Sequence, residues 1–237
     1  MKQTLKNIHR SGWPSVIVLF ILVFAARSVI ADWNPVPTGS MKPTILEGDV
    51  ILVNRAAYDL KVPFTTTHLM NWAEPEKGEI IVLKSPDDGT RLVKRVIAVP
   101  GDHLQLRGDT VWLNGIPAPL KLVKIDDWVE LSTADRKSHR AAYETLAGHN
   151  HSIMLDRRRP LPFKGDLVVP PGHYFVMGDH RNNSRDSRYF GLVERSLILG
   201  RAHRVLLSVD IKDGWKPRWA RFFQPLDSID QLAQAER

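Results

Sequence analysis

The sequence predicts a mainly β fold, made of coiled or barrel-like antiparallel sheets with an inserted subdomain, together with one N-terminal transmembrane helix. Short runs rich in Val, Ile and Leu, punctuated by Gly, Pro, Asp and Asn, predict the strands. These runs are residues 48–55, 78–85, 91–102, 110–115, 165–179 and 201–210. Their close spacing favours coiled antiparallel sheets over a parallel α/β sheet. One strongly apolar stretch, residues 13–33, predicts the transmembrane helix.

The apolar stretch reads "WPSVIVLFILVFAARSVIADW" and lies between Trp13 and Trp33, an arrangement typical of interfacial aromatic residues. About 20 helical residues cross a bilayer, so the stretch is just long enough. Positive charge is concentrated before it, which places the N-terminus in the cytoplasm; the residues are Lys2, Lys6 and Arg10. The alternative is a signal peptide cleaved after the small residue Ala31.

This topology divides the chain into a cytoplasmic tail at 1–12, a membrane anchor at 13–33 and an extracytoplasmic domain at 34–237. Within that domain, the strand-like runs predict a core made of residues 34–102 and 172–210. The irregular, Pro-rich stretch at about 103–171 predicts an insertion between the two halves of the core.

Two local signals lie within the expected insertion. The tripeptide "LNG" at 113–115 predicts a β-hairpin turn, because Asn and Gly tolerate the positive φ that such turns need. Residues 132–148, "STADRKSHRAAYETLAG", predict the one helix outside the membrane anchor, with Ser132 or Thr133 as its N-cap.

Composition excludes some functions. The formal net charge is +7, from 33 Lys and Arg against 26 Asp and Glu. The basic residues are scattered, so we interpret them as a solvated surface and expect no nucleic-acid partner. The one run, Arg157–Arg159, faces lipid headgroups or solvent in this topology. The chain has no Cys, which excludes disulfides, thiol nucleophiles and Cys-based zinc sites. The pair His149 and His151 is interpreted as incidental, so we expect no metal.

The stretch "PTGSMKPTILEGDVILV", residues 37–53, places Ser40 between Gly39 and Met41. A Ser beside a Gly is typical of a turn, and this one lacks the Gly-x-Ser-x-Gly pattern of a nucleophile elbow. As a nucleophile, Ser40 needs a base within hydrogen-bond reach. None of the nine His residues lies in a recognisable triad pattern, which leaves a lysine held in its neutral form as the other type of base.

The run "RLVKRVIAVPGD", residues 91–102, provides such a lysine. On a strand, alternate residues face the same way, so Lys94 shares a face with Leu92, Val96 and Ala98. Arg95 points the other way and cannot serve as a base, because guanidinium does not deprotonate. The alternative is an ordinary surface lysine on an edge strand.

A third stretch, "VMGDHRNNSRDSRYFGLV" at 176–193, predicts a polar loop after a strand. We expect ion pairs among its charged residues, which are Asp179, Arg181, Asp186 and Arg188. Ser184 and Ser187 are candidates to orient an amine. The alternative is an ordinary polar loop with Asx turns.

Together, the anchor and the three stretches, in this order, resemble the type I signal peptidases, which are membrane-anchored Ser–Lys endopeptidases. The resemblance implies that Ser40 is the nucleophile and Lys94 the general base. It implies that the Thr38 hydroxyl and the Ser40 N–H form the oxyanion hole, and that Ser184 hydrogen-bonds the lysine. It also implies that three charged residues brace the site: Asp179, Asp186 and Arg188.

The same resemblance implies the substrate, the location and the absence of a cofactor. The substrates are preproteins with small residues before the cut, and the candidates for lining shallow pockets are Val36, Met41 and Leu92. The enzyme is expected to be a single-pass protein of the plasma (inner) membrane, with its catalytic domain on the outer, periplasmic or extracellular, side. It contacts the lipid bilayer and needs no metal or cofactor.

The chain departs from the family pattern in a few places. The family motif Gly-Asp-Asn-Arg-Asp-Asn-Ser carries His180 and Asn182 here in place of Asn and Asp. Many bacterial members have two N-terminal membrane segments, whereas this sequence shows one. Residues 214–226, "GWKPRWARFFQPL", suit either a membrane surface or a basic strand end.

Three other functions stay open. The first is a specialised Ser–Lys peptidase that processes a secretion or conjugation component. The second is a self-cleaving repressor peptidase, which the anchor and the lack of a helix-turn-helix pattern disfavour. The third is a catalytically decayed, membrane-tethered binding paralogue, which the presence of both Ser40 and Lys94 disfavours. The oligomeric state is left open.

Overall fold

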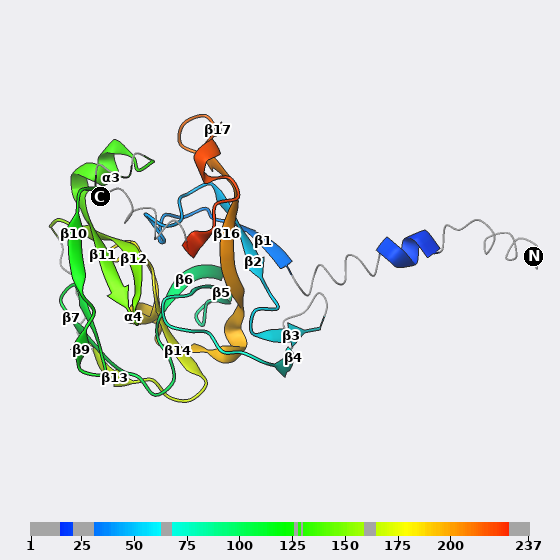
Figure 1. The fold of residues 1–237 in the computed structure, drawn as a ribbon, viewed down its shortest axis with the longest axis horizontal. Coiled ribbons are helices and arrows are strands. Elements are labelled where there is room, and N and C mark those ends of the chain that lie inside the picture. Colours follow the sequence, from blue (N-terminus) through cyan, green and yellow to red (C-terminus); the bar gives the residue numbers. More distant parts are fainter. Residues whose placement is uncertain are drawn as a thin grey trace, which may run out of the picture.

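The main sheet is built from strands that lie on both sides of the expected insertion in the sequence. The computed structural model describes residues 15–20, 31–62, 68–125, 128, 130–158 and 165–227. The eight-stranded sheet has the order β1-β2-β16-β5-β6-β14-β15, and β17 pairs with the C-terminal end of β16 (Figure 1). Its strands are β1 (Ala31–Pro35), β2 (Asp49–Asn54), β5 (Ile80–Lys84), β6 (Arg91–Ala98), β14 (His173–Met177), β15 (Val193–Glu194), β16 (Ile198–Asp210) and β17 (Lys216–Pro217).

Three smaller sheets complete the strands. Two of them lie together on one side of the main sheet in Figure 1 and are formed by the chain between β6 and β14. They have the orders β10-β11-β12 and β13-β7-β8-β9, with β7 (His103–Arg107), β8 (Thr110–Leu113), β9 (Ile116–Pro117), β10 (Leu120–Val123), β11 (His139–Leu146), β12 (His149–Asp156) and β13 (Gly165–Val168). The third is the hairpin β3 (Asp59–Lys61) with β4 (His68–Asn71). The short helices are α3 (Thr133–Ser138), α4 (Ser187–Phe190), η2 (Arg195–Leu197) and η3 (Trp219–Arg221).

The predicted mainly β, antiparallel character is confirmed. Each of the six apolar runs contains a strand, and the pairs within the main sheet are antiparallel. The predicted "LNG" hairpin is confirmed between β8 and β9, where Asn114 and Gly115 have φ of 52° and 81°. Both residues of this turn need positive φ, which Asn and Gly adopt at least cost.

The expected membrane anchor falls mostly outside the described residues. Residues 15–20 form a helix, whereas 13–14 and 21–30 are not described. The last three residues of the expected anchor, 31–33, belong to β1 and pair with β2, a strand that the sequence analysis did not predict. Among the described residues no helix has the length and apolar character needed to cross a bilayer.

The predicted helix at 132–148 is wrong over most of its length. The helix α3 begins at the expected place, with the Ser132 side chain accepting a hydrogen bond from the Asp135 N–H, but it ends at Ser138. From His139 the chain forms β11, which pairs with β12 over eight residues. Ala141 and Ala142, good helix formers, are fully buried in this strand. Tertiary pairing therefore overrides helix propensity.

The expected insertion packs directly onto the main sheet. One apolar cluster joins Ile97 of β6 and Met177 of β14 to Leu104, Val111 and Leu146 of the smaller sheets. Burial of apolar area of this kind stabilises by about 25 cal/mol per Å². The two parts thus share a continuous core, and a second cluster lies between β2, β16 and the chain that follows β1.

A buried ion pair also ties the smaller sheets to the main sheet. Arg181, which follows β14, donates to both carboxylate oxygens of Glu144 in β11, and both side chains are fully buried. His151 of β12 lies 3.0 Å from the same carboxylate. Burial would raise the pKa of Glu144, but Arg181 and His151 together outweigh it and hold that pKa well below its usual range. Each charge is buried only because the other one is present.

We predict that Glu144→Ala destabilises the fold strongly, because it leaves the Arg181 guanidinium buried without a counter-ion. The expected loss of unfolding free energy is about 3–5 kcal/mol, measured by urea denaturation of the full-length chain in detergent. Lys216→Ala, which breaks the exposed Lys216–Asp213 pair, is the matched control and should leave the unfolding midpoint almost unchanged. Equal shifts for the two variants would contradict the structural role of the buried pair.

Candidate active site

Ser40 lies in a tight turn just after β1. Residues 40–44 form consecutive turns, closed by hydrogen bonds from Lys42 N–H to Gly39 O and from Ile45 N–H to Met41 O, at 3.2 and 3.0 Å. Met41 and Ile45 are buried in the apolar cluster below the turn. The Ser40 side chain is half-buried at the top of the turn. The sequence folds this way because Met41 and Ile45 anchor the turn in the core, while Gly39, which has no side chain, leaves space for the Lys42 side chain that lies over it.

Lys94 reaches Ser40 from the middle of β6. The two residues are 54 positions apart in the sequence, yet Lys94 Nζ lies 2.9 Å from Ser40 Oγ. The same amine donates to the Val93 carbonyl at 2.9 Å, and only 2% of the Lys94 residue is exposed. A neutral amine at this distance can accept the serine proton, whereas an ammonium can only donate.

Burial governs the charge of this amine. Removal from water lowers the pKa of Lys94 from 10.5 to about 8, against the smaller opposing effects of the Asp186 and Asp179 carboxylates. A neutral form is therefore substantially populated in mildly alkaline solution. The expectation that Lys94 lies in a dry environment agrees with the structure, and a surface lysine on an edge strand does not, because β6 pairs with β5 on one side and β14 on the other.

Each carboxylate near Lys94 is held by an arginine. Arg188 binds Asp186 through Nε and Nη2, both at 2.7 Å, as predicted for this loop. Asp179 pairs with Arg95 of β6, at 2.8 and 2.7 Å, and not with an arginine of its own loop. Burial would raise the pKa of Asp179, but Arg95, together with His151 and Thr44, outweighs it and keeps that pKa below its usual value. Because each carboxylate is engaged by an arginine in a bidentate pair, it favours the protonated form of the Lys94 amine less than a free carboxylate would.

Arg95 and Thr44 are site residues that sequence reasoning missed. The Thr44 hydroxyl donates to Asp179 at 2.6 Å, which fastens the turn that holds Ser40 to the Asp179–Arg95 pair. The signal available in the sequence was the prediction that Arg95 points away from Lys94. A buried arginine on a central strand requires a carboxylate partner. The partner lies 84 residues away, so spacing alone could not name it.

The loop after β14 comes very close to the Ser40 turn at Gly178. A Cβ added there would lie 2.4 Å from Ser40 O and 2.3 Å from Ser184 Oγ, so only glycine fits. The Asp186 carboxylate accepts the Gly178 N–H at 2.9 Å and also caps α4. Ser187 Oγ accepts the Val176 N–H at 2.9 Å, so it supports the backbone and does not orient an amine.

The remaining predicted residues are placed as follows. Ser184 is buried, but its hydroxyl makes no hydrogen bond to Lys94 or to any other described group. Thr38 is exposed, two residues before Ser40. Val36 and Met41 are buried in one apolar cluster, whereas the half-buried Leu92 packs against another, so the three do not form a single packed group.

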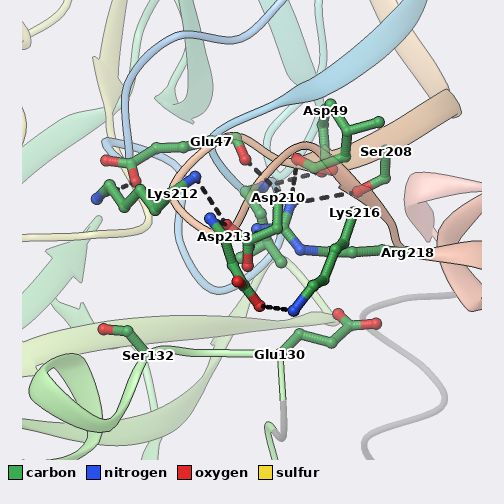
Figure 2. A network of polar contacts seen from close by, with 12 residues as sticks. Glu47, Asp49, Glu130, Ser132, Ser208, Asp210, Lys212, Asp213, Lys216 and Arg218 are labelled. Atoms are coloured by element: carbon green, nitrogen blue, oxygen red, sulfur yellow. Dashed lines mark hydrogen bonds and ion pairs between the residues drawn. The ribbon is translucent and has the colours of Figure 1, made fainter.

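The segment that carries Ser40, residues 40–49 (the Ser40 segment), is held at its C-terminal end by a network of charged side chains (Figure 2). Glu47 pairs with Lys212 of the turn between β16 and β17, and its backbone carbonyl accepts from Arg218 at 3.0 Å. Arg221 of η3, itself buried, binds Asp49 and the Thr44 carbonyl at 2.6 and 2.9 Å. The stretch 214–226 therefore braces the Ser40 segment through its arginines.

The same stretch exposes its aromatic residues. Trp215, Trp219 and Phe223 are 69%, 72% and 61% exposed.

In the described parts of the chain, no group of three or more His, Asp or Glu side chains is arranged to hold a metal ion. His151 instead faces Glu144, as described above, and His149 is exposed.

Comparisons with known proteins identify the family. The model of the family "Signal peptidase, peptidase S26" matches residues 10–207. Signal peptidase I of Pseudomonas fluorescens is 35% identical over 205 residues, covering 81% of this chain and 69% of that protein. Signal peptidase I of Buchnera aphidicola subsp. Schizaphis graminum is 30% identical over 243 residues, covering 87% of this chain and 78% of that protein. A crystal structure of a signal peptidase I from Enterococcus faecalis V583 aligns with 54% of this chain and 96% of its own, at 30% identity and a TM-score of 0.35.

The matches first define the class: the chain is a peptidase, a hydrolase of peptide bonds. More particularly, it belongs to the signal peptidase family, peptidase S26, as the resemblance implied.

We predict that Lys94→Met stabilises the protein at neutral pH. The folded-state pKa of Lys94, about 8, lies below the unfolded value of 10.5, so below pH 8 folding forces a charged amine into a dry site. This penalty is fully present below about pH 8 and disappears as the pH rises to 10.5. Methionine fills similar space without charge, and we expect a gain of about 1–3 kcal/mol in unfolding free energy at pH 7.

The measurement is urea denaturation at pH 7 and pH 10, where the gain should shrink at the higher pH. Lys84→Met, at the half-buried end of β5, controls for the loss of one positive charge and should show no such pH dependence. A Lys94→Met variant less stable than wild type at pH 7 would contradict the desolvated amine.

Proposed function

We propose that this chain is a membrane-anchored serine endopeptidase that removes N-terminal signal peptides from translocated preproteins through a Ser40–Lys94 dyad. The observation that carries the proposal is the 2.9 Å separation of Lys94 Nζ and Ser40 Oγ, with the amine buried and its pKa lowered to about 8. Membership of the signal peptidase family supports the reaction and the substrate class.

Chemistry begins with the neutral form of Lys94. Its nitrogen accepts the Ser40 hydroxyl proton while Oγ attacks the scissile carbonyl carbon, which forms a tetrahedral oxyanion. The resulting ammonium returns the proton to the leaving amine as the C–N bond breaks, leaving an acyl-enzyme. Water then attacks the ester, Lys94 accepts its proton, and Ser40 leaves with a proton returned from the lysine. The proton balance closes within the dyad.

The oxyanion is assigned to the Ser40 N–H and the Thr38 hydroxyl. Among the described residues, neither group makes a hydrogen bond within the chain, and Thr38 is exposed beside the turn. One donor aimed at the developing charge is worth about 3 kcal/mol of barrier. Asp179, Asp186 and Arg188 support the dyad through the ion pairs described above, and Ser184 lies next to them with an unpaired hydroxyl that is available to the amine when substrate binds.

Specificity for small residues before the cut is assigned to the surface around Ser40. Leu92, half-buried, supplies apolar atoms from the β6 side, whereas Val36 and Met41, buried in the cluster below the Ser40 turn, support this surface from within the core. A shallow apolar surface accepts Ala and excludes larger side chains by contact.

Lipid contact is assigned to the edge from which the anchor leaves the domain. Strand β1 starts at Ala31, within the last three residues of the apolar stretch, and Figure 1 places the β3–β4 hairpin on the same side of the main sheet. Apolar side chains are exposed there: Trp33, Leu69, Met70 and Trp72 are each more than half exposed. Ser40 follows β1 closely, so a preprotein held by its own apolar segment presents its cleavage site near the nucleophile, which raises the effective concentration.

We predict that Ser40→Ala, Lys94→Ala and Lys94→Arg each abolish cleavage of a preprotein. Arginine keeps the positive charge but cannot accept the serine proton, so the Lys94→Arg variant separates a base from a structural cation. Losses of about 10⁴-fold or more in kcat are expected, because the dyad works as a unit. The measurement is gel-based cleavage by the full-length chain in detergent. Appreciable activity of Lys94→Arg would remove Lys94 as the base.

A generic preprotein with Ala at the first and third positions before the cut separates general from specialised processing. Cleavage of that substrate supports the general signal peptidase. Failure to cleave it, together with cleavage of a single secretion component, would support the specialised alternative.

We predict that kcat/KM rises with pH through a midpoint near 8, the folded-state pKa of Lys94. Below that pH the amine is protonated and cannot act as a base, and kcat/KM reports the titration of the free enzyme. The measurement is the pH profile of preprotein cleavage between pH 6 and 10. A profile that is flat across this range, or rises only above about pH 10, would contradict a lysine base with a lowered pKa.

A further inference from the structure

The residue after Asp179 connects the Ser40 turn with the smaller sheets. His180 is only 3% exposed. Its backbone N–H donates to the Ser40 carbonyl at 3.1 Å, and its ring Nδ1 lies 3.1 Å from the Gly39 carbonyl. One residue thus holds the backbone carbonyls of the nucleophile and of the residue before it.

The opposite ring nitrogen of His180 contacts the insertion. Its Nε2 lies 3.0 Å from Nε2 of His139, and the rings meet edge to face with centroids 4.6 Å apart. His139 is both the C-cap of α3 and the first residue of β11. A path of direct contacts therefore runs from Gly39 through His180 and His139 into the insertion.

Hydrogen-bond directions assign the protons of His180. The Gly39 carbonyl can only accept, so His180 Nδ1 carries a hydrogen and donates it. Burial, together with the charge of His139, lowers the pKa of His180 to about 4, so the ring is neutral at physiological pH. A neutral ring with hydrogen on Nδ1 presents a lone pair at Nε2. His139 Nε2 must then be the donor across the 3.0 Å contact.

The opposite nitrogen of the His139 ring contacts its own helix. His139 Nδ1 lies 2.8 Å from the Ser138 hydroxyl oxygen and 3.0 Å from the Asp135 carbonyl oxygen. Ser138 in turn donates to the Ala134 carbonyl at 2.8 Å. The His139 ring is thus held on both sides, by α3 and by His180.

The same short helix holds the turn on the other side of Ser40. Asp135 of α3 pairs with Lys42 at 2.9 Å. The Lys42 side chain lies over Gly39, where an added Cβ would be 2.9 Å from Lys42 Cε. Leu46, further along the same segment, packs against Leu131 and Met154. On the C-terminal side of the nucleophile, Lys42 is thus in contact with α3, and Leu46 with other residues of the insertion.

We propose that His180 is a positioning residue for the Ser40 turn, and that through His139 it makes the insertion part of the device that aligns the nucleophile. This inference rests on the proposed function, because it concerns the geometry of Ser40 toward Lys94. An asparagine at position 180 can donate from its amide nitrogen to the Gly39 carbonyl but is too short to reach His139. The histidine in this chain therefore adds a connection to the insertion that an asparagine does not make.

The kinetic test uses the full-length chain in detergent and a preprotein substrate. We expect His180→Ala to lower kcat about tenfold or more, the effect of one lost alignment hydrogen bond, with KM changed less than about twofold. His180→Asn should recover most of the lost kcat, because it keeps the Gly39 hydrogen bond. His173→Ala is the matched control, since its Nδ1 also faces a backbone carbonyl, Pro171 O at 3.0 Å, but lies outside the site.

A double-mutant cycle tests whether His139 acts through His180. His139→Ala should lower kcat, and His139→Ala combined with His180→Ala should be no worse than His180→Ala alone. Additive losses in the double variant, unchanged kcat in His180→Ala, or a loss confined to KM would each overturn the proposal. Thermal denaturation of every variant verifies that losses of kcat are not losses of fold.

A second measurement is independent of activity. Nitrogen-15 NMR of the histidine rings in the full-length Ser40→Ala variant should show hydrogen on Nδ1 and not on Nε2 of His180, and hydrogen on Nε2 of His139. Hydrogen on Nε2 of His180 would overturn the proposed connection. If Ser40→Ala still cleaved preprotein, the proposed function would fail, whereas the ring protonation would still decide whether the two histidines are connected as inferred.

Discussion

The removal of one amine from water is the interaction on which the rest of this structure depends. Lys94 is surrounded by a paired central strand, the Ser40 turn and the loop after β14, and its pKa falls to about 8 for that reason. Two nearby carboxylates oppose this lowering of the Lys94 pKa. Each one is bound to an arginine, Asp186 to Arg188 and Asp179 to Arg95, so their charge is largely neutralised where it would act. Bidentate hydrogen bonds offset the desolvation cost of burying these ions, and for Asp179 the Thr44 hydroxyl adds a further hydrogen bond.

The fold brings this arrangement together from distant parts of the chain. The proposed nucleophile, Ser40, comes from a turn after β1, the Lys94 amine from β6, and the two carboxylates near that amine from the loop after β14. Glu144 and Arg181, His139 and His180, and Asp135 and Lys42 are three polar connections between the insertion and the segments that carry the site. Together with the shared apolar core, they make the insertion a structural part of the site region, although its sequence pattern suggested a separate subdomain.

Sequence reasoning succeeded where the signal was local. The apolar runs predicted the strands, because alternation and turn residues are read within a few positions, and "LNG" predicted its hairpin for the same reason. It failed at 139–146, where Ala-rich sequence forms a strand because β12 pairs with it. The choice of Ser40 and Lys94 as partners came from the family resemblance, since strand alternation could only offer Lys94 as a candidate. Partners such as Arg95 for Asp179 and His139 for His180 lie 84 and 41 residues apart, beyond the reach of any local pattern.

The most direct test of the account is the titration of the Lys94 amine itself. Carbon-13 NMR of labelled lysine in the full-length Ser40→Ala chain, with Lys94→Met to assign the signal, follows its protonation between pH 6 and 12. The account predicts a midpoint near 8. A midpoint at or above the ordinary lysine value, about 10.4, would show that the amine is solvated or ion-paired in the folded protein and would contradict its role as the base.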